Sequence, residues 1–416
     1  VPMTLAQLIN VLYNVVDRIY IGMIPENSTL ALTGLGVALP LISAVTAFAN
    51  LFGMGGAPLF SITRGRGNNE EAEYIMGNTF FLLIISGVVL TILGLIFKRP
   101  LLYLFGASDA TITFANSYIT IYLLGTIFVM IGLGMNSFIN AQGFGSIGML
   151  TVALGAITNI ILDPIFIFLL DWGVSGAAIA TIISQFVSAL WIFTFLTGKK
   201  TILKLKVSCF KLKAKRVKSI VTLGLSGFIM AITNSAVQIA CNSTLQLYGG
   251  DLYVGVMTVI NTIREMFMMP IHGITNSAQP VMGFNYGAKK YDRVRKSINF
   301  TTIVSIIYAT AVWGIIYLFP AFFIKVFNHN PELIDAAIPS LRIYFFGFFM
   351  MSLQFSGQSV FVALGKSRQA IFFSLLRKAV IVIPLTLYLP KINNLGTTGV
   401  FLAEPVSNFI GGAACY

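Results

Sequence analysis

Apolar residues occur along this chain in long continuous runs that short polar stretches separate. Twelve runs are long enough for a membrane-spanning helix, which needs about 20 apolar residues. They lie near 3–24, 30–62, 74–97, 114–140, 148–170, 174–197, 219–247, 253–284, 297–324, 336–363, 369–389 and 397–416. Because the runs do not alternate apolar and polar residues, they predict helices and not the strands of a transmembrane barrel. The second and eighth runs are long for one span, so we expect them to tilt, bend or project beyond the bilayer.

The composition supports this interpretation, since 56% of the 416 residues are hydrophobic and 10% are charged. A soluble domain carries about 25% charged residues, so lipid must cover most of this surface. We therefore expect an all-α polytopic membrane protein of the cell membrane. The sequence begins and ends inside apolar runs, so we expect further residues beyond both ends. The first run has no basic segment or cleavage site that would indicate a signal peptide.

The net charge of +13 is compatible with a nucleic-acid partner, but the positions of the basic residues argue against one. Lys and Arg gather in the short loops after even-numbered runs, as the positive-inside rule predicts for cytoplasmic loops. Both termini are then cytoplasmic. The segment 198–218 holds nine basic residues and no acidic residue. It can contact lipid headgroups or a partner, but we favour a cytoplasmic linker that fixes topology.

The two halves of the sequence resemble each other. Residues 141–143 (Ala-Gln-Gly) align with 363–365 (Ala-Leu-Gly), and 173–176 align with 396–399 at almost the same offset. Each half holds six runs, so both halves enter the membrane from the same side. This predicts two six-helix bundles related by a pseudo-two-fold axis along the membrane normal. The predicted organisation is an N-terminal lobe at 1–197, a basic linker at 198–218 and a C-terminal lobe at 219–416.

Acidic residues at bilayer depth are the main candidates for function, because inserting each one costs roughly 2.5–3.5 kcal/mol. Asp17 belongs to a polar stripe in the first run, since Asn10, Asn14 and Asp17 recur on one helix face. Such a stripe should face the bundle interior. The alternative is an ion pair between Asp17 and Arg18, which is awkward because adjacent helical residues point about 100° apart.

Asp163 in the fifth run is the second acidic candidate. Asn159 lies one turn earlier, and Pro164 can bend the helix or free a carbonyl group. Thr181 in the sixth run can bring a hydroxyl group to the same pocket. These oxygen ligands suit a hard cation such as Na⁺. A buried carboxylate can hold a proton instead, because burial disfavours its charged form. We therefore expect Na⁺ or H⁺ here and no organic cofactor.

Other polar residues are candidates for a substrate cavity. Glu265 either titrates, binds a cationic substrate or forms a structural ion pair with Arg264. Asn234 and Gln238 either line a substrate path or hold helices together, and we favour the second role. Glu404 is assigned to the outer end of the last run and carries little weight. The candidate cavity residues are Asn14, Asn234, Gln238, Glu265 and Gln354.

Nearly the whole sequence resembles the multidrug and toxic compound extrusion (MATE) transporters. The most specific segments are 12–22 (LYNVVDRIYIG) and 159–167 (NIILDPIFI). Segment 279–288 (QPVMGFNYGA) is similar to the end of the eighth helix in the bacterial MepA-like branch. The resemblance implies two six-helix lobes around a V-shaped cavity. It also implies Na⁺- or H⁺-driven export, with the family's amino-terminal cation site at Asp17, Asn159, Asp163 and Thr181.

Some members of that family carry a further acidic residue in the seventh or tenth helix. This sequence has Asn234 and Gln238 in the seventh run and Gln354 in the tenth, so a coupling site in the C-terminal lobe is not expected. The predicted function is secondary active multidrug export by alternating access, in which Na⁺ or H⁺ is exchanged for amphiphilic or organic cations. We expect a working monomer in the bilayer, and no enzymatic activity.

Three other functions fit the sequence less well. A lipid-linked oligosaccharide flippase of the same superfamily would favour a wide cationic cavity, whereas the basic residues are assigned to cytoplasmic loops. A membrane-embedded enzyme needs a dense polar catalytic set, whereas the two histidines and three cysteines are scattered. A channel needs a ring of charges or a filter loop, and none is recognisable. The sequence also lacks the nucleotide-binding pattern GxxxxGK[ST].

Overall fold

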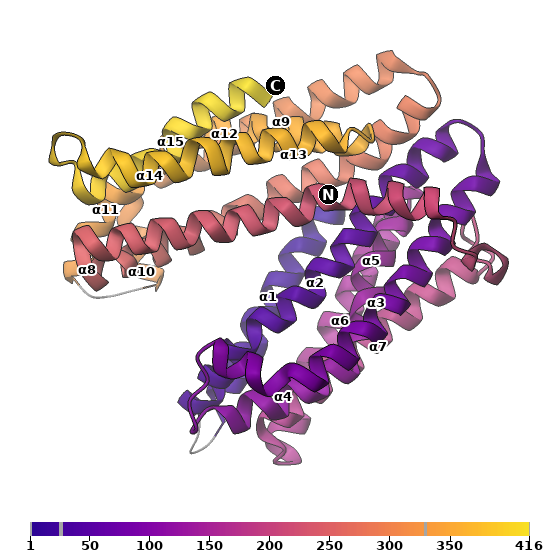
Figure 1. The fold of residues 1–416 in the computed structure, drawn as a ribbon, viewed down its shortest axis with the longest axis horizontal. Helices are drawn as coiled ribbons and strands as arrows, with labels where there is room; N and C mark the ends of the chain where they lie inside the picture. Colours follow the sequence, from indigo (N-terminus) through magenta and orange to yellow (C-terminus); the bar gives the residue numbers. More distant parts are fainter. Residues whose placement is uncertain (1, 25–27, 328–330, 416) are drawn as a thin grey trace. The chain divides into compact units, whose positions relative to one another are not determined.

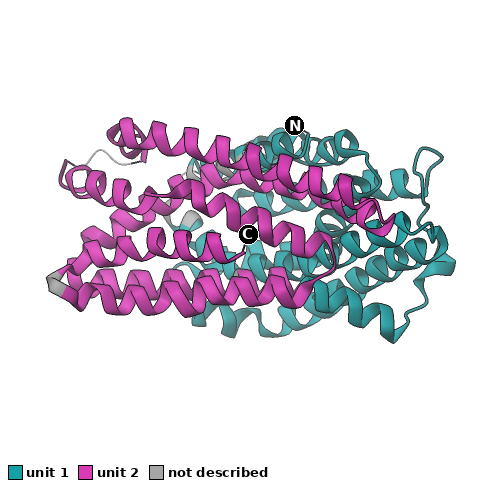
Figure 2. Ribbon diagram, turned by 90° about the horizontal axis from the view of Figure 1, so that it is seen from above, with its two compact units in different colours: residues 1–224 teal, residues 225–416 magenta. Residues whose placement is uncertain are grey.

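The computed structural model describes residues 2–24, 28–327 and 331–415, and within these ranges it contains helices and no strand. The chain divides into two compact units, residues 1–224 and 225–416 (Figure 2). Eight of the described helices are long and apolar enough to cross a membrane, and ten spans result when each of two bent pairs is counted once. The predicted all-α membrane class is therefore confirmed.

Unit 1 contains the helices that match the first six predicted spans (Figure 1). They are α1 (Pro2–Gly22), α2 (Ser28–Gly65), α3 (Asn69–Leu104), α4 (Ile112–Leu124), α5 (Thr126–Ala141), α6 (Gly145–Pro164), the π-helix η1 (Ile165–Leu169) and α7 (Gly173–Thr197). Helices α4 and α5 meet at a bend of 58° and form one broken span. The fifth span consists of α6 and η1, because Pro164 lacks the N–H that a regular helix requires.

The chain passes from unit 1 into unit 2 within α8 (Ala214–Gly287), which begins after the short 3₁₀ helix η2 (Val207–Phe210). The remaining helices are α9 (Tyr291–Leu318), α10 (Pro320–Phe327), α11 (Pro331–Phe345), α12 (Phe348–Ala363), α13 (Ser367–Leu375), the π-helix η3 (Leu376–Val382), α14 (Ile383–Tyr388), the 3₁₀ helix η4 (Leu389–Asn394) and α15 (Gly396–Cys415). A break at Gly250, where φ is 63°, divides α8 into two spans. Helices α11 and α12 are the second bent pair, at 48°. Helices α1 and α15 correspond in position to the first and last predicted spans, but they are not among these ten.

The internal repeat is visible in the backbone. Gly143 and Gly365 both have positive φ, at 96° and 73°, and so do Gly173 and Gly396, at 50° and 51°. These are aligned positions of the two halves, and glycine adopts such angles at no steric cost. The chain thus turns in the same way after corresponding spans.

Glycines also allow close helix contacts within unit 1. A Cβ atom on Gly53 of α2 would lie 2.8 Å from the Cα and carbonyl oxygen of Gly134 in α5. Membrane helices pack through small residues of this kind, because no hydrophobic effect drives their association inside lipid. The α2–α5 contact therefore depends on the absence of side chains at both positions.

The basic segment 198–218 is packed onto unit 1. The buried amide of Gln142 accepts hydrogen bonds from the backbone N–H groups of Ile202 and Leu203, both at 2.9 Å. The buried amide of Asn78 donates to the carbonyl oxygens of Cys209 and Lys211 at 2.9 and 3.0 Å. These two side chains fix the path of the segment, while its role as a topology-fixing linker between lobes stays a prediction.

Ion pairs attach the same segment to the first turns of α3. Arg216 donates two hydrogen bonds of 2.6 Å to Glu71 and lies over the Tyr74 ring. Glu73 accepts a hydrogen bond from Lys206, which raises the pKa of the Lys206 ammonium above its usual value. Part of the positive charge in the segment is thus balanced by the protein itself.

Replacing Asn78 or Gln142 by alanine should release the basic segment. Each change leaves buried backbone groups without partners, at a cost of about 1–3 kcal/mol. The opened population should then rise about fivefold or more, and trypsin should cleave within 199–211 faster by the same factor. The sites and rates can be followed by mass spectrometry on the purified protein. The control is Asn69→Ala, since Asn69 is exposed at the start of α3. Equal rates in all three variants would contradict this anchoring role.

Candidate cation site and unit 2 pocket

The two acidic candidates of unit 1 come together inside the bundle. Asp17 of α1 and Asp163 of α6 are both buried, and the two helices pack along each other. The carboxyl groups of Asp17 and Asp163 lie close enough to interact electrostatically. Two neighbouring carboxylates repel each other, so the pair favours a state in which a proton or a cation reduces the negative charge. The geometry therefore provides a place for one positive charge, as a proton or as a cation.

Asn159 completes the side of this pair that α6 provides. It is fully buried one turn before Asp163, and its Nδ2 donates to the Asp163 Oδ1 at 3.1 Å. Asp163 is followed by Pro164 and η1, so the helix loses its regular hydrogen bonding next to the carboxyl group. π-Helical turns inside α-helices are frequent at functional sites. The local backbone thus combines a buried acid with an irregular, deformable turn.

Tyrosines that the sequence analysis did not select surround the acidic pair. Tyr13 lies one turn before Asp17 on α1, near Gln185 of α7. Tyr118 on α4 is buried and lies near Asp17. Thr181 of α7 is buried where α7 packs against α4, and its hydroxyl group has no hydrogen-bond partner among the described residues. The sequence does indicate Tyr13, because it precedes Asp17 by four residues and therefore lies on the same face of the helix.

The donor set fits a small hard cation. Oδ1 of Asn159 and Oδ2 of Asp163 are buried and accept no hydrogen bond from the described residues. A buried acceptor without a donor costs about 1–3 kcal/mol, which a cation or proton would offset. Within the described part of the chain, no three His, Cys, Asp or Glu side chains converge. The site thus matches Na⁺ or H⁺ better than a transition metal, which prefers nitrogen or sulfur ligands.

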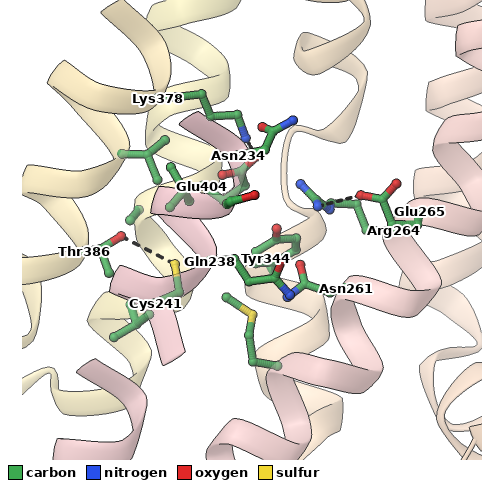
Figure 3. Close-up of a pocket in the computed structure, with 16 residues that line it drawn as sticks. Asn234, Gln238, Cys241, Asn261, Arg264, Glu265, Tyr344, Lys378, Thr386 and Glu404 are labelled. Atoms are coloured by element: carbon green, nitrogen blue, oxygen red, sulfur yellow. Dashed lines mark hydrogen bonds and ion pairs between the residues drawn. The ribbon is translucent and has the colours of Figure 1, made fainter. Parts of the chain in front are cut away.

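Three of the predicted cavity residues line one pocket in unit 2, which has a volume of about 110 Å³ (Figure 3). Asn234 and Gln238 come from the first half of α8, and Glu265 comes from its second half. Polar residues from other helices complete the lining. They include Asn261, Arg264, Tyr344, Lys378, Thr386 and Glu404.

Glu265 forms the ion pair with Arg264 that was one of its three predicted roles. Its Oε1 lies 2.7 Å from the Nη2 of Arg264, and its side chain is 59% exposed. Gln354 is buried but does not line this pocket. The side chain of Asn14 lies outside the described residues. Substrate contact by any of these residues stays a prediction.

A buried charge cluster in unit 2 contradicts two expectations. Glu404 lies in the middle of α15 rather than at its end, and its Oε1 accepts a 2.8 Å hydrogen bond from Arg377. Arg377 and the adjacent Lys378 belong to η3, so basic residues are not confined to loops. The sequence does contain a signal for this cluster, because Arg377 and Lys378 interrupt the apolar run 369–389. Placing two cations within a membrane span is costly unless they face the bundle interior.

Comparisons with known proteins agree with this architecture. The family model MatE matches the chain twice, at residues 2–165 and 227–388. The sequence is 26% identical to the multidrug export protein MepA of Staphylococcus haemolyticus over 416 residues, covering 98% of this chain and 90% of that protein. It is 22% identical to MepA of Staphylococcus saprophyticus over 384 residues, covering 92% and 84%.

Solved structures show the same fold. A MATE transporter in a bent conformation superposes with a TM-score of 0.93 at 24% identity, covering 100% of this chain and 91% of that one. An outward-facing MATE family transporter of the MOP superfamily gives 0.92 at 24% identity, covering 99% and 92%. These neighbours have twelve transmembrane helices in two bundles, so the predicted fold class is confirmed.

The double match agrees with the internal repeat. Members of this family are transporters, which confirms that the chain is not an enzyme. Because the model matches most of the sequence, once in each half, the chain belongs to the MatE family of membrane transporters.

Proposed function

We propose that this chain is a secondary active multidrug exporter of the cell membrane that exchanges H⁺ or Na⁺ for amphiphilic or cationic compounds. Support comes from the family match and from relatives that are named multidrug export proteins. The cytoplasmic position of both termini follows from the basic loops. The internal repeat supplies two bundles in one chain, so a monomer suffices for alternating access.

One observation carries the coupling mechanism, namely the buried pair Asp17 and Asp163. Intramembrane acids are costly, and here two of them lie near each other, with Asn159 hydrogen-bonded to Asp163. Binding of one proton or one Na⁺ changes the charge of the Asp17–Asp163 pair by one unit. Two neighbouring buried carboxyl groups resist ionising together, which favours H⁺ as the coupling ion.

The proposed mechanism uses repulsion within this pair. Two unit negative charges about 4 Å apart repel by about 4 kcal/mol at an effective dielectric constant of 20. That energy corresponds to a population change of almost a thousandfold. Ionisation of both carboxyl groups would separate α1 from α6 at the irregular turn after Pro164, and loss of one charge would bring them together. A transporter that alternates between two states needs such a difference between its loaded and unloaded forms.

A lipid-linked oligosaccharide flippase is the second candidate, because unit 2 buries cationic groups. Arg264, Arg377 and Lys378 lie inside unit 2, and the first and third line the pocket. A pyrophosphate-linked lipid would pair with such cations. The acidic pair in unit 1 and the family relatives favour multidrug export over this alternative.

Asp17→Asn and Asp163→Asn should each reduce ethidium efflux from energised vesicles by tenfold or more. Asparagine keeps the size of the side chain but can neither carry the charge nor release a proton. Asp109→Asn is the matched control, since Asp109 is an exposed acid in a loop of the same unit. Monodisperse elution in detergent would show that each variant folds. Full activity in both variants would refute the proposed coupling site.

Collapse of the pH gradient should stop efflux by the wild-type protein, whereas collapse of the Na⁺ gradient should slow it less than twofold. This expectation follows from the repulsion between two ionised carboxyl groups, which a proton on either group relieves. The measurement uses vesicles treated with a protonophore or with a Na⁺-selective ionophore. If only the Na⁺ ionophore stops efflux, the coupling ion is Na⁺ and the proton assignment is wrong.

A further inference from the structure

The pocket in unit 2 buries more positive than negative charge. Arg377, Lys378 and Glu404 are all buried, so two cations face one carboxylate. Arg264 adds a third cation at the pocket wall, and the carboxylate that pairs with it, Glu265, is mostly exposed. A buried charge without a partner costs several kcal/mol. The cluster is therefore incomplete as an arrangement of protein charges alone.

Lys378 is the cation that remains without a good partner. Arg377 takes the short contacts, donating to Glu404 at 2.8 Å and to Asn408 at 2.6 Å. The Lys378 Nζ lies 3.9 Å from the same Glu404 oxygen, beyond hydrogen-bonding distance, and its side chain is 8% exposed. It forms no hydrogen bond with any described residue. An ammonium group has three N–H donors, so all three are available.

The surroundings of Lys378 are suited to an anion. In Figure 3 its side chain reaches toward Asn234 and Glu404 at the wall of the cavity. Gln238 and Tyr344 line the same cavity and can donate hydrogen bonds. The volume of about 110 Å³ accommodates a small charged group but not a whole drug-sized molecule, whose site occupies at least about 300 Å³. The pocket therefore fits one functional group of a larger ligand.

We propose that the unit 2 pocket is a subsite for the anionic group of an amphiphile, a carboxylate or a phosphate. Lys378 is its charge partner, and Asn234 and Gln238 supply neutral donors. The proposal rests on the proposed transport function and extends it, because substrates then include zwitterionic and anionic amphiphiles besides cations. The same chemistry serves a drug carboxylate and the headgroup of an anionic lipid.

The test compares one fluorescent xanthene dye that has a free carboxylate with its methyl ester. Binding to the purified full-length protein in a neutral detergent is measured by fluorescence anisotropy. The wild-type protein should bind the carboxylate at least tenfold more tightly than the ester. Lys378→Gln should weaken carboxylate binding tenfold or more and leave ester binding within twofold. Lys378→Arg should keep the preference, because the positive charge remains.

Lys366→Gln is the matched control, since Lys366 is an exposed lysine of the same unit. It should keep the wild-type preference. Equal binding of the two dyes by a folded wild-type protein would overturn the proposal. So would an unchanged preference in Lys378→Gln, because the anion partner would then lie elsewhere.

Competition separates the two sources of the anionic group. Displacement of the carboxylate dye by phosphatidic acid in mixed micelles, but not by short-chain carboxylates, would assign the subsite to a lipid headgroup. Displacement by an amphiphilic drug carboxylate would assign it to drugs. Because binding is measured without an ion gradient, the dye preference persists even if coupled efflux fails. Efflux with no dye preference would instead refute the subsite alone.

Discussion

Burial of charge in a bilayer is the constraint on which this structure depends. Lipid offers no partner for a backbone or side-chain polar group, so helices satisfy the backbone and every intramembrane charge must find a partner inside a bundle. Among the described residues, two clusters hold the most deeply buried of these charges. The pair Asp17 and Asp163 lies in unit 1, and Arg377, Lys378 and Glu404 lie in unit 2. Neither cluster is electrically complete.

The two clusters share a local backbone feature. The fifth span of unit 1 changes to a π-helix directly after Pro164, and the corresponding span of unit 2 contains a π-helix that ends just before Pro384. A proline removes one backbone donor, and a π-helical turn is one way to rearrange the remaining hydrogen bonds. The repeat thus provides a deformable turn next to buried charge in both halves, with acids in the first and mainly cations in the second.

Sequence reasoning found the spans and the acidic pair because both follow from the cost of burial. Twelve apolar runs correspond to helices, and the insertion cost makes three acids within them candidates, namely Asp17, Asp163 and Glu265. It did not find Tyr118, because Tyr118 of α4 and Asp17 of α1 come together only through the tertiary packing of helices that are far apart in the sequence. Aromatic residues are common in membrane helices, so no local pattern distinguishes a site tyrosine from one that faces lipid.

The unit 2 cluster was missed for a different reason. Basic residues in a membrane sequence usually indicate topology, and long Lys and Arg side chains at helix ends can extend to the interface. Arg377 and Lys378 lie within the eleventh span instead, where Glu404 and Asn408 of α15 hold Arg377. The tertiary contact between η3 and α15 determines that these cations are buried inside the bundle. A single sequence does not reveal that contact. The broken α8 likewise depends on one residue, Gly250, whose φ of 63° is not evident from an apolar pattern.

The two clusters carry opposite net charge, which suits one of them to bind a cation and the other to bind an anionic group of a substrate. Coupling between two sites needs only that each ligand prefers one of the same two states, and it is reciprocal in free energy. Within the proposed mechanism, a positive charge is needed at Asp17 and Asp163 and a negative charge at Lys378. An amphiphile bearing an anionic group would remove the excess charge of unit 2, just as a proton removes that of unit 1. Each ligand would then lower the cost of burying charge in the state that binds it, which is the difference in free energy that alternating access requires.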